Sequence, residues 1–290
     1  MKKHSVLPLL ALAGGGAGLI LHRWELALAW DEANGVYGSG QPAGAILVIL
    51  ALALTAAFFL LGRGGARLQD WRDGLRCPLT GYMAVMAAAA LLLLASAGLG
   101  AFSVIEKLAR WRLDPERNLL PLMDGLCSLM CLPAALSVLK LGQGGYRGTL
   151  NPEDRWMTTM PAYTAAFWAI SVYQANAVSP YFKLYSWEML SAICLLLALY
   201  CAAAGAYGGR MAALFPQLAL TGIVLDLTAM GSGSLDRVEL LRRAALLLTV
   251  LGMVYPALRA QFGPAWTQEE LARSQKREDE ETDTQETTEE

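Results

Sequence analysis

YMAVMAAAALLLLASAGLGAF, residues 82–102, is a stretch of twenty-one residues without one charged side chain. A helix of about twenty apolar residues is long enough to cross the hydrocarbon core of a bilayer. The whole chain has the same character, because 55% of its 290 residues are hydrophobic, 17% are charged and its mean hydropathy is +0.39. A soluble domain needs more surface charge than this composition supplies. We therefore expect a lipid bilayer to surround the protein.

Seven further apolar runs have similar lengths. Together the eight runs are Val6–Leu21, Ala43–Leu61, Tyr82–Phe102, Leu119–Leu139, Met157–Val178, Met189–Tyr207, Met211–Met230 and Leu240–Leu258. None of them alternates polar and apolar residues as a strand does, so the pattern indicates helices. The sequence predicts an all-α, polytopic transmembrane helical bundle of about eight spans over residues 1–265.

Charged residues near the ends of the first and last runs need an explanation. The first run is short unless its helix continues through Arg23 and Glu25 to Ala29. The last run contains Arg242 and Arg243 near one end. Long charged side chains can extend to the headgroup region while their stems stay in the apolar layer. We expect these charges to lie at the membrane surface.

The distribution of basic residues predicts the orientation. Eight spans place both termini on one side, and that side holds fourteen Lys and Arg residues against nine on the other. Cytoplasmic segments carry the excess of basic residues, so both termini are predicted to be cytoplasmic. A cleaved signal peptide is the alternative for the first run, but the apolar stretch continues beyond Ala13 and favours an uncleaved span.

The C-terminal segment has a different composition from the rest of the chain. Residues 269–290 hold ten acidic and three basic residues, whereas the remainder has twenty basic and fifteen acidic ones. Such a composition is typical of disorder, and residues 266–290 are predicted to form an acidic cytoplasmic tail. Basic residues are scattered among the loops, so nothing favours nucleic acid as a partner.

Cysteine usage and motif searches give no sign of a catalytic or metal centre. Cys127 and Cys131 are one helical turn apart, but both histidines, His4 and His22, are far from them in sequence. Small buried packing residues are the preferred interpretation of the cysteines, and we expect no disulfide, no metal and no cofactor. The common nucleophile, zinc-protease, phosphate-loop and redox motifs are all missing, which disfavours an enzyme.

Similar segments in the two halves raise the possibility of a parallel repeat of four plus four spans. Trp24–Ala29 follows the first run and Trp187–Ala192 follows the fifth, while Met130–Ala134 is similar to Met253–Ala257. Runs of Leu and Ala also produce such matches by chance, so both readings stay open. Gly14 and Gly18 form a small-residue pattern in the first span, which predicts close helix packing there.

The segment VYQANAVSPYFKLYSWEML, residues 172–190, places polar and aromatic residues between two apolar runs. Tyr181, Tyr185 and Glu188 are spaced four and three apart, so they share one face of a helix. A carboxylate beside phenols can bind a cation or an amine. The alternative is an aromatic belt at the membrane surface with a Glu that extends to the headgroups.

Asp124 and Asp226 lie inside apolar runs, where an ionised carboxylate costs a few kcal/mol. Each could be a protonatable transport site or one member of a structural ion pair, with Arg117 near the first and Arg237 near the second. With Glu25, Asp31 and Glu188 they are predicted to gather toward the outer half of the bundle. Such a cluster is either an acidic vestibule for cations or a charged rim.

Two segments resemble a known group of proteins. Val172–Ala192, with Tyr173, Pro180, Tyr185 and Glu188, and Trp24–Ala27 after the first run resemble uncharacterised multi-spanning membrane proteins of Gram-positive anaerobes. No activity is assigned to that group, and the resemblance implies only a location in the bacterial cytoplasmic membrane.

Two functions are compatible with these features. The first is a non-catalytic membrane scaffold or accessory subunit, whose buried polar groups set the helix packing and whose partners are membrane proteins. The second is a transporter of a small solute or cation. Its substrate-binding residues would come from Glu25, Asp124, Tyr181, Tyr185, Glu188 and Asp226.

Overall fold

A computed structural model describes residues 3–31, 36–37, 42–65, 70–113, 121–176, 182–232, 236–264, 266–267 and 270. Within these ranges the chain forms eight α-helices: α1 (Lys3–Ala29), α2 (Pro42–Leu61), α3 (Thr80–Leu113), α4 (Leu122–Arg147), α5 (Thr159–Asn176), α6 (Phe182–Ala206), α7 (Phe215–Ala229) and α8 (Arg237–Phe262). Three short 3-10 segments flank them: η1 (Pro152–Thr158), η2 (Arg210–Leu214) and η3 (Met230–Ser232). Strands β1 (Trp30–Asp31) and β2 (Val36–Tyr37) form a two-residue antiparallel pair. The prediction of a helical fold is confirmed.

Six of the eight helices are long and apolar enough to cross a membrane by length and composition. They are Lys3–Ala29, Pro42–Leu61, Thr80–Leu113, Leu122–Arg147, Tyr185–Ala206 and Arg210–Ser232. The other two, α5 and α8, coincide with predicted runs but carry more polar residues, including Gln174 and Asn176 on α5 and four arginines on α8. Eight crossings are therefore not confirmed.

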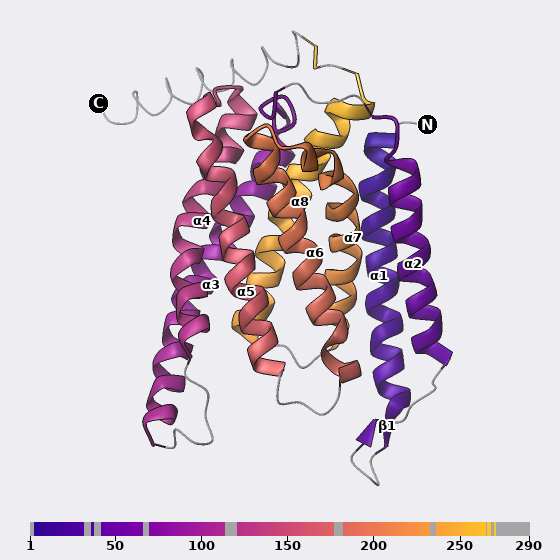
Figure 1. The fold of residues 1–290 in the computed structure, drawn as a ribbon, viewed down its shortest axis with the longest axis vertical. Coiled ribbons are helices and arrows are strands. Elements are labelled where there is room, and N and C mark those ends of the chain that lie inside the picture. The colour runs from indigo at the N-terminus through magenta and orange to yellow at the C-terminus, as the bar shows by residue number, and fades with distance from the viewer. Residues whose placement is uncertain are drawn as a thin grey trace, which may run out of the picture.

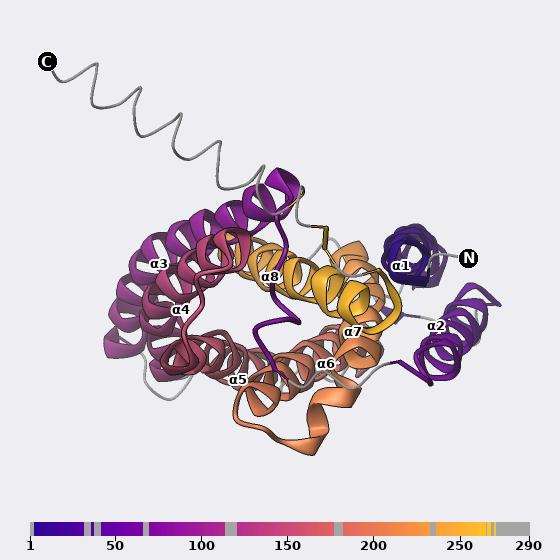
Figure 2. The ribbon, with the colours of Figure 1, turned by 90° about the horizontal axis from the view of Figure 1, so that it is seen from above.

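Six helices follow one another around a closed ring. The helices run alongside each other in Figure 1, and the view from above in Figure 2 shows α3, α4, α5, α6, α7 and α8 in chain order. The ring closes where α3 packs along α8. Outside the ring, α1 packs against α7 and α8, and α2 packs against α1 and α7.

Glycines on α1 allow this close packing. A Cβ at Gly14 would overlap Leu54 of α2, and a Cβ at Gly18 would overlap Thr228 of α7. Both glycines are buried, so the predicted close packing at Gly14 and Gly18 is confirmed.

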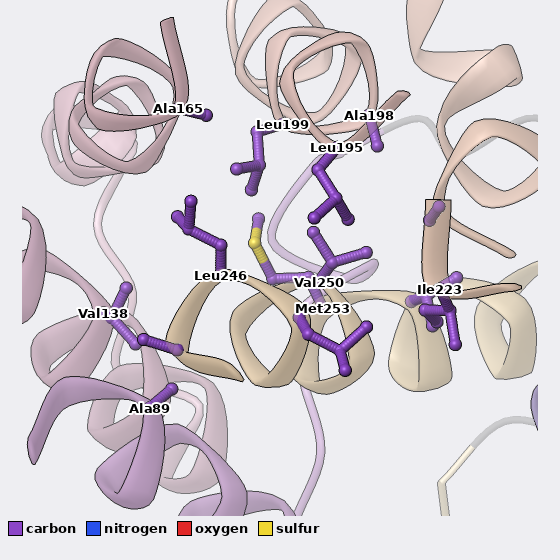
Figure 3. Packing of buried hydrophobic residues seen from close by; sticks show 14 of the residues in the cluster. Ala89, Val138, Ala165, Leu195, Ala198, Leu199, Ile223, Leu246, Val250 and Met253 are labelled. Atoms are coloured by element: carbon purple, nitrogen blue, oxygen red, sulfur yellow. The ribbon is translucent and has the colours of Figure 1, made fainter. Parts of the chain in front are cut away.

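Leucine, valine and methionine side chains fill the middle of the ring. Figure 3 shows Leu195 and Leu199 of α6 facing Leu246, Val250 and Met253 of α8, and all five are at most 1% exposed. These five side chains form what we call the apolar layer. The outer surface of α2, in contrast, exposes Ile49 and Leu52 at 66% and 65%, as expected for a helix that faces lipid.

Helix packing does not show the repeat. Four plus four spans would make α2 the counterpart of α6 and α3 the counterpart of α7. α6 packs closely along α7, whereas the described residues of α2 have no comparable contact with α3. The repeat stays unconfirmed.

Candidate functional site

A cavity of about 320 Å³ lies inside the ring, at the end away from the two chain termini. Five helices contribute to its wall: the last part of α3 and α5, and the first part of α4, α6 and α8. Its size is at the lower end of the range for small-molecule sites. Because its lining includes acids, bases, hydroxyls and one phenol, we call it the polar cavity.

Arg243 is the centre of a buried group of charges at the floor of the polar cavity. Its Nη1 donates to Asp226 Oδ1 at 3.0 Å and to Ser191 Oγ at 2.8 Å. Its Nε donates to Glu239 Oε1 at 3.0 Å, and its Nη2 lies 4.0 Å from Glu188 Oε2. The side chains of Arg243 and Asp226 are both 0% exposed. A guanidinium with several carboxylates around it is the arrangement that makes a buried charge tolerable.

Trp168 completes this group, which we call the Arg243 cluster: Trp168, Glu188, Asp226, Glu239 and Arg243. The indole Nε1 of Trp168 donates to Glu239 Oε1 at 2.8 Å, and the Arg243 guanidinium carbon lies 5.0 Å from the Trp168 ring centroid. The cluster thus joins α5, α6, α7 and α8. Contacts within the cluster connect these four ring helices at the same depth in the ring.

A second ion pair lies at the opposite wall. Lys107 Nζ and Ser171 Oγ both donate to the Asp124 carboxylate. Ser128 Oγ donates to the Asp124 carbonyl oxygen at 2.8 Å. The Lys107 side chain is 48% exposed, so this pair stands where the cavity opens.

Arg242 lies beside Arg243 in sequence but has very different surroundings. It lines the polar cavity and is 3% exposed. Its Nη2 is 3.5 Å from Ser128 Oγ, which is a long hydrogen bond, and its side chain also contacts the Cys131 thiol, while its buried Nε has no partner among the described residues. Among the described residues, no carboxylate lies within 4.0 Å of this guanidinium.

The burial of these arginines overturns one expectation. Arg242 and Arg243 were expected to extend to the membrane surface, but both point into the ring. Acids and hydroxyls on facing helices stabilise a charge there, whereas the lipid side of α8 would offer none. The spacing of Glu239 and Arg243, four residues apart on one helix, is a signal in the sequence that could have identified the pair.

The structure brings together part of the predicted site. Asp124, Tyr185 and Glu188 line the polar cavity. Asp226 lies beneath it and pairs with Arg243 rather than with Arg237, while Asp124 pairs with Lys107. Tyr181 lies outside the described residues, as do Arg117 and the side chain of Asp31.

Glu25 does not belong to this site. Its Oε2 lies 3.3 Å from Nδ1 of the buried His22, on α1 outside the ring. The ring of His22 contacts that of Trp187 edge to face, with centroids 6.3 Å apart. The expected gathering of acids is therefore only partial, because α1 presents Glu25 to α2 and not to the cavity.

A second cavity, of about 230 Å³, lies in the ring at the end near the termini. Trp71 and Leu75, Cys201 and Gly205 of α6, and Met253 of α8 contribute to its lining. We call it the terminal-side cavity. The apolar layer separates it from the polar cavity.

Residues 70–79, which precede α3 and lie beside the terminal-side cavity, contact the rest of the bundle at several points. Cys77 N donates to the Gly145 carbonyl at 3.0 Å, and Trp266 Nε1 donates to the Arg76 carbonyl at 2.9 Å. The Trp266 ring also stacks on Arg259, with 3.3 Å from guanidinium carbon to ring centroid. Trp266, which the sequence assigned to the tail, thus belongs to the bundle, while residues 271–290 lie outside the described residues.

Within the described part of the chain, no three His, Cys, Asp or Glu side chains are grouped so that they could hold a metal ion. The five cysteines are free thiols. No protein-family model matches the chain, and no curated protein or solved structure matches it either.

Proposed function

We propose that the protein is a multi-pass membrane transporter of a small polar solute, with the polar cavity as the solute site. One observation carries this proposal: two cavities lie at opposite ends of one helix ring, with a packed barrier between them. A transporter needs a site that can be reached from either side of the membrane in turn. Sites of this kind lie between helices and are lined by polar groups that lipid would not tolerate.

The barrier is thick enough to close the path. Arg242 lines the polar cavity and Met253, eleven positions later on α8, lines the terminal-side cavity. At 1.5 Å per residue this corresponds to about 16 Å. The Arg243 cluster and the apolar layer occupy this interval. Movement of a solute between the cavities requires α6 and α8 to separate there.

The proposal includes eight crossings, with α5 and α8 as the two helices that length and composition alone do not identify. Both run alongside the other ring helices, and the polar cavity is lined by Ser171 and Asn176 of α5 and by Glu239 and Arg242 of α8. The excess of basic residues supports cytoplasmic termini. The polar cavity would then open to the outside of the cell.

The scaffold hypothesis accounts for less of the structure. The Arg243 cluster fits it, because these groups pair with one another and connect four helices. A cavity with an unpaired buried arginine in its wall has no role in a scaffold. The transporter is therefore the function that the geometry supports better.

Cysteine labelling combined with uptake tests the proposal. In a variant with the five native cysteines replaced by Ala, Ser103→Cys places a thiol in the polar cavity and Ala202→Cys places one in the terminal-side cavity. We expect a membrane-impermeant methanethiosulfonate to modify the first thiol from one side and the second from the other. Ile49→Cys on the lipid face is the unreactive control.

The same variants are then reconstituted in liposomes with radiolabelled L-amino acids, short carboxylates, sodium and rubidium as probes. Uptake above that of protein-free liposomes, blocked by modification at Ser103→Cys, supports the proposal. Accessibility of both cavity thiols from the same side, or the absence of uptake for every probe, contradicts it.

A further inference from the structure

We infer that the polar cavity binds a small amino acid, and that Arg242 holds its carboxylate. This inference rests on the proposed function, since it names the class of solute for the same cavity. Arg242 and Arg243 are adjacent on α8 and are buried to nearly the same extent.

The two arginines differ in their counter-ions. Arg243 has carboxylate oxygens of Asp226 and Glu239 at 3.0 Å and one of Glu188 at 4.0 Å. Arg242 is 3% exposed, and its contacts among the described residues are a long hydrogen bond to Ser128 and a contact with the Cys131 thiol, without a carboxylate within 4.0 Å. Arg243 thus has carboxylates in direct contact, whereas the nearest acids of Arg242, Glu239 and Asp124, act on it only from beyond 4.0 Å.

An unpaired buried guanidinium is costly, because it has lost water without gaining an anion. Arg242 faces the cavity, so a bound anion can restore what the protein does not provide. Guanidinium groups bind carboxylates through two parallel hydrogen bonds. A carboxylate in the cavity would use the Nη nitrogens of Arg242, because its Nε is fully buried.

The remaining charges of the wall favour a solute that is also positively charged. The bases are Lys107 and Arg242, and the acids are Asp124, Glu188, Asp236 and Glu239. A phosphate or another simple anion would be repelled by this excess of acids and has no positive group to offset the repulsion. An amino acid brings its own ammonium group, and Glu188, with Tyr185 in the same wall, is an acid that can receive it.

Binding in detergent tests the site without requiring transport. Tritiated L-amino acids are the probes, and the amino acid that binds is compared with the amine that lacks its carboxylate and the acid that lacks its amino group. We expect both analogues to compete poorly. We expect Arg242→Gln to weaken binding by about 30-fold or more, since one partner of a buried charge pair is removed. Arg242→Lys should weaken binding less. Glu106→Gln, which replaces an exposed acid near the end of α3, should leave binding unchanged.

Thermal unfolding without solute distinguishes a binding arginine from a structural one. A structural arginine would lower the melting temperature when replaced, whereas removal of an uncompensated charge should leave it unchanged or raise it. We therefore expect Arg242→Met to be at least as stable as the wild-type protein. A lower melting temperature, equal competition by the amine, or the absence of binding for every amino acid overturns the inference.

The two proposals fail in different ways. Amino-acid binding that depends on Arg242, without any uptake into liposomes, would overturn the transporter and leave the binding site. Uptake that Arg242→Gln does not change would overturn the role of Arg242 and leave the transporter.

Discussion

Arg242 and Arg243 show how surroundings determine the role of a buried charge. Each stands on α8 inside the ring, where an isolated charge would be strongly unfavourable. Arg243 is surrounded by acids from three helices, and its contacts serve the fold. Arg242 contacts the Ser128 hydroxyl and the Cys131 thiol, has no carboxylate within 4.0 Å among the described residues, and lines the cavity. Neighbouring residues of one type thus have a structural role in one case and an inferred binding role in the other.

Asp226→Asn tests whether the ion pairs of Arg243 stabilise the fold. The side chain is 0% exposed and its carboxylate pairs with Arg243 at 3.0 Å. Removing one partner of a buried pair leaves the other partly uncompensated, so we expect the free energy of unfolding to fall by about 3 kcal/mol. Thermal or denaturant unfolding in detergent measures this change. Glu106→Gln is the control, because that carboxylate is 73% exposed and its 4.0 Å pair with Arg110 should contribute little. Equal stability of the two variants would contradict the assignment.

Cys77 provides a prediction of pH dependence in the segment before α3. This thiol is 0% exposed, and burial raises its pKa from an ordinary value of 9.0 to about 11. The folded state therefore favours the neutral thiol. Its contribution to stability is complete below pH 9 and is lost as the pH rises toward 11, because only the unfolded chain ionises readily there. We expect unfolding curves of the wild-type protein to show this loss and those of Cys77→Ala to show less of it. An identical pH dependence would contradict the prediction.

At the scale of the helix, α1 shows how small residues determine contact with a neighbour. It lies outside the ring, where its glycines let α2 and α7 approach its backbone. Van der Waals packing of this type is a main source of helix association in lipid, since the hydrophobic effect does not distinguish a helix surface from lipid tails. The position of α1 therefore depends on a few glycines rather than on its overall apolarity.

The same substitution at two nearby glycines tests this point. Gly18 lies against Thr228, whose buried hydroxyl donates to the Val224 carbonyl at 2.8 Å and cannot easily move away. Gly16 has no neighbouring atom within 4 Å of an added Cβ. We expect Gly18→Ala to reduce the free energy of unfolding by about 1–3 kcal/mol through overpacking. Gly16→Ala should be neutral or slightly stabilising, because Ala favours the helix. Equal effects at both positions would exclude the close contact as the cause.

At the scale of the whole molecule, ring closure places residues from distant parts of the chain around one cavity. Residues of α3 meet those of α8, more than one hundred positions later, and the ring has a polar cavity at one end and a smaller cavity at the other. The Arg243 cluster stands between these ends and links four of the ring helices. For a solute to pass from one cavity to the other, the helices would have to move apart at the level of the Arg243 cluster.

Labelling from each side of the membrane tests whether α5 crosses it. Glu153 precedes α5 and Arg237 begins α8, and both side chains are exposed. In the cysteine-free variant we expect Glu153→Cys to be labelled from the side of the termini and Arg237→Cys only from the opposite side. Intact and permeabilised cells distinguish the two. Labelling of both positions from the same side would show that α5 does not cross, since an odd number of crossings must separate them.

Composition and run length were sufficient to predict a helical fold with several apolar helices and the approximate positions of the eight α-helices. These properties are local, because the thickness of the hydrocarbon core sets the length of an apolar run whatever surrounds it. The same reasoning identified Asp124, Glu188 and Asp226 as acids that need partners. It could not identify those partners, since Leu and Ala cover many faces of these helices and do not define how each helix is rotated.

The arrangement in space determined the rest. Ring order and helix rotation direct Arg242 and Arg243 inward, pair Asp226 with Arg243 and keep Glu25 away from the cavity. Each of these outcomes depends on contacts between residues far apart in the chain, and contact free energies between whole helices decide among rotations that look equivalent in sequence. The cavity and its unpaired arginine exist only because five helices meet at one end of the ring.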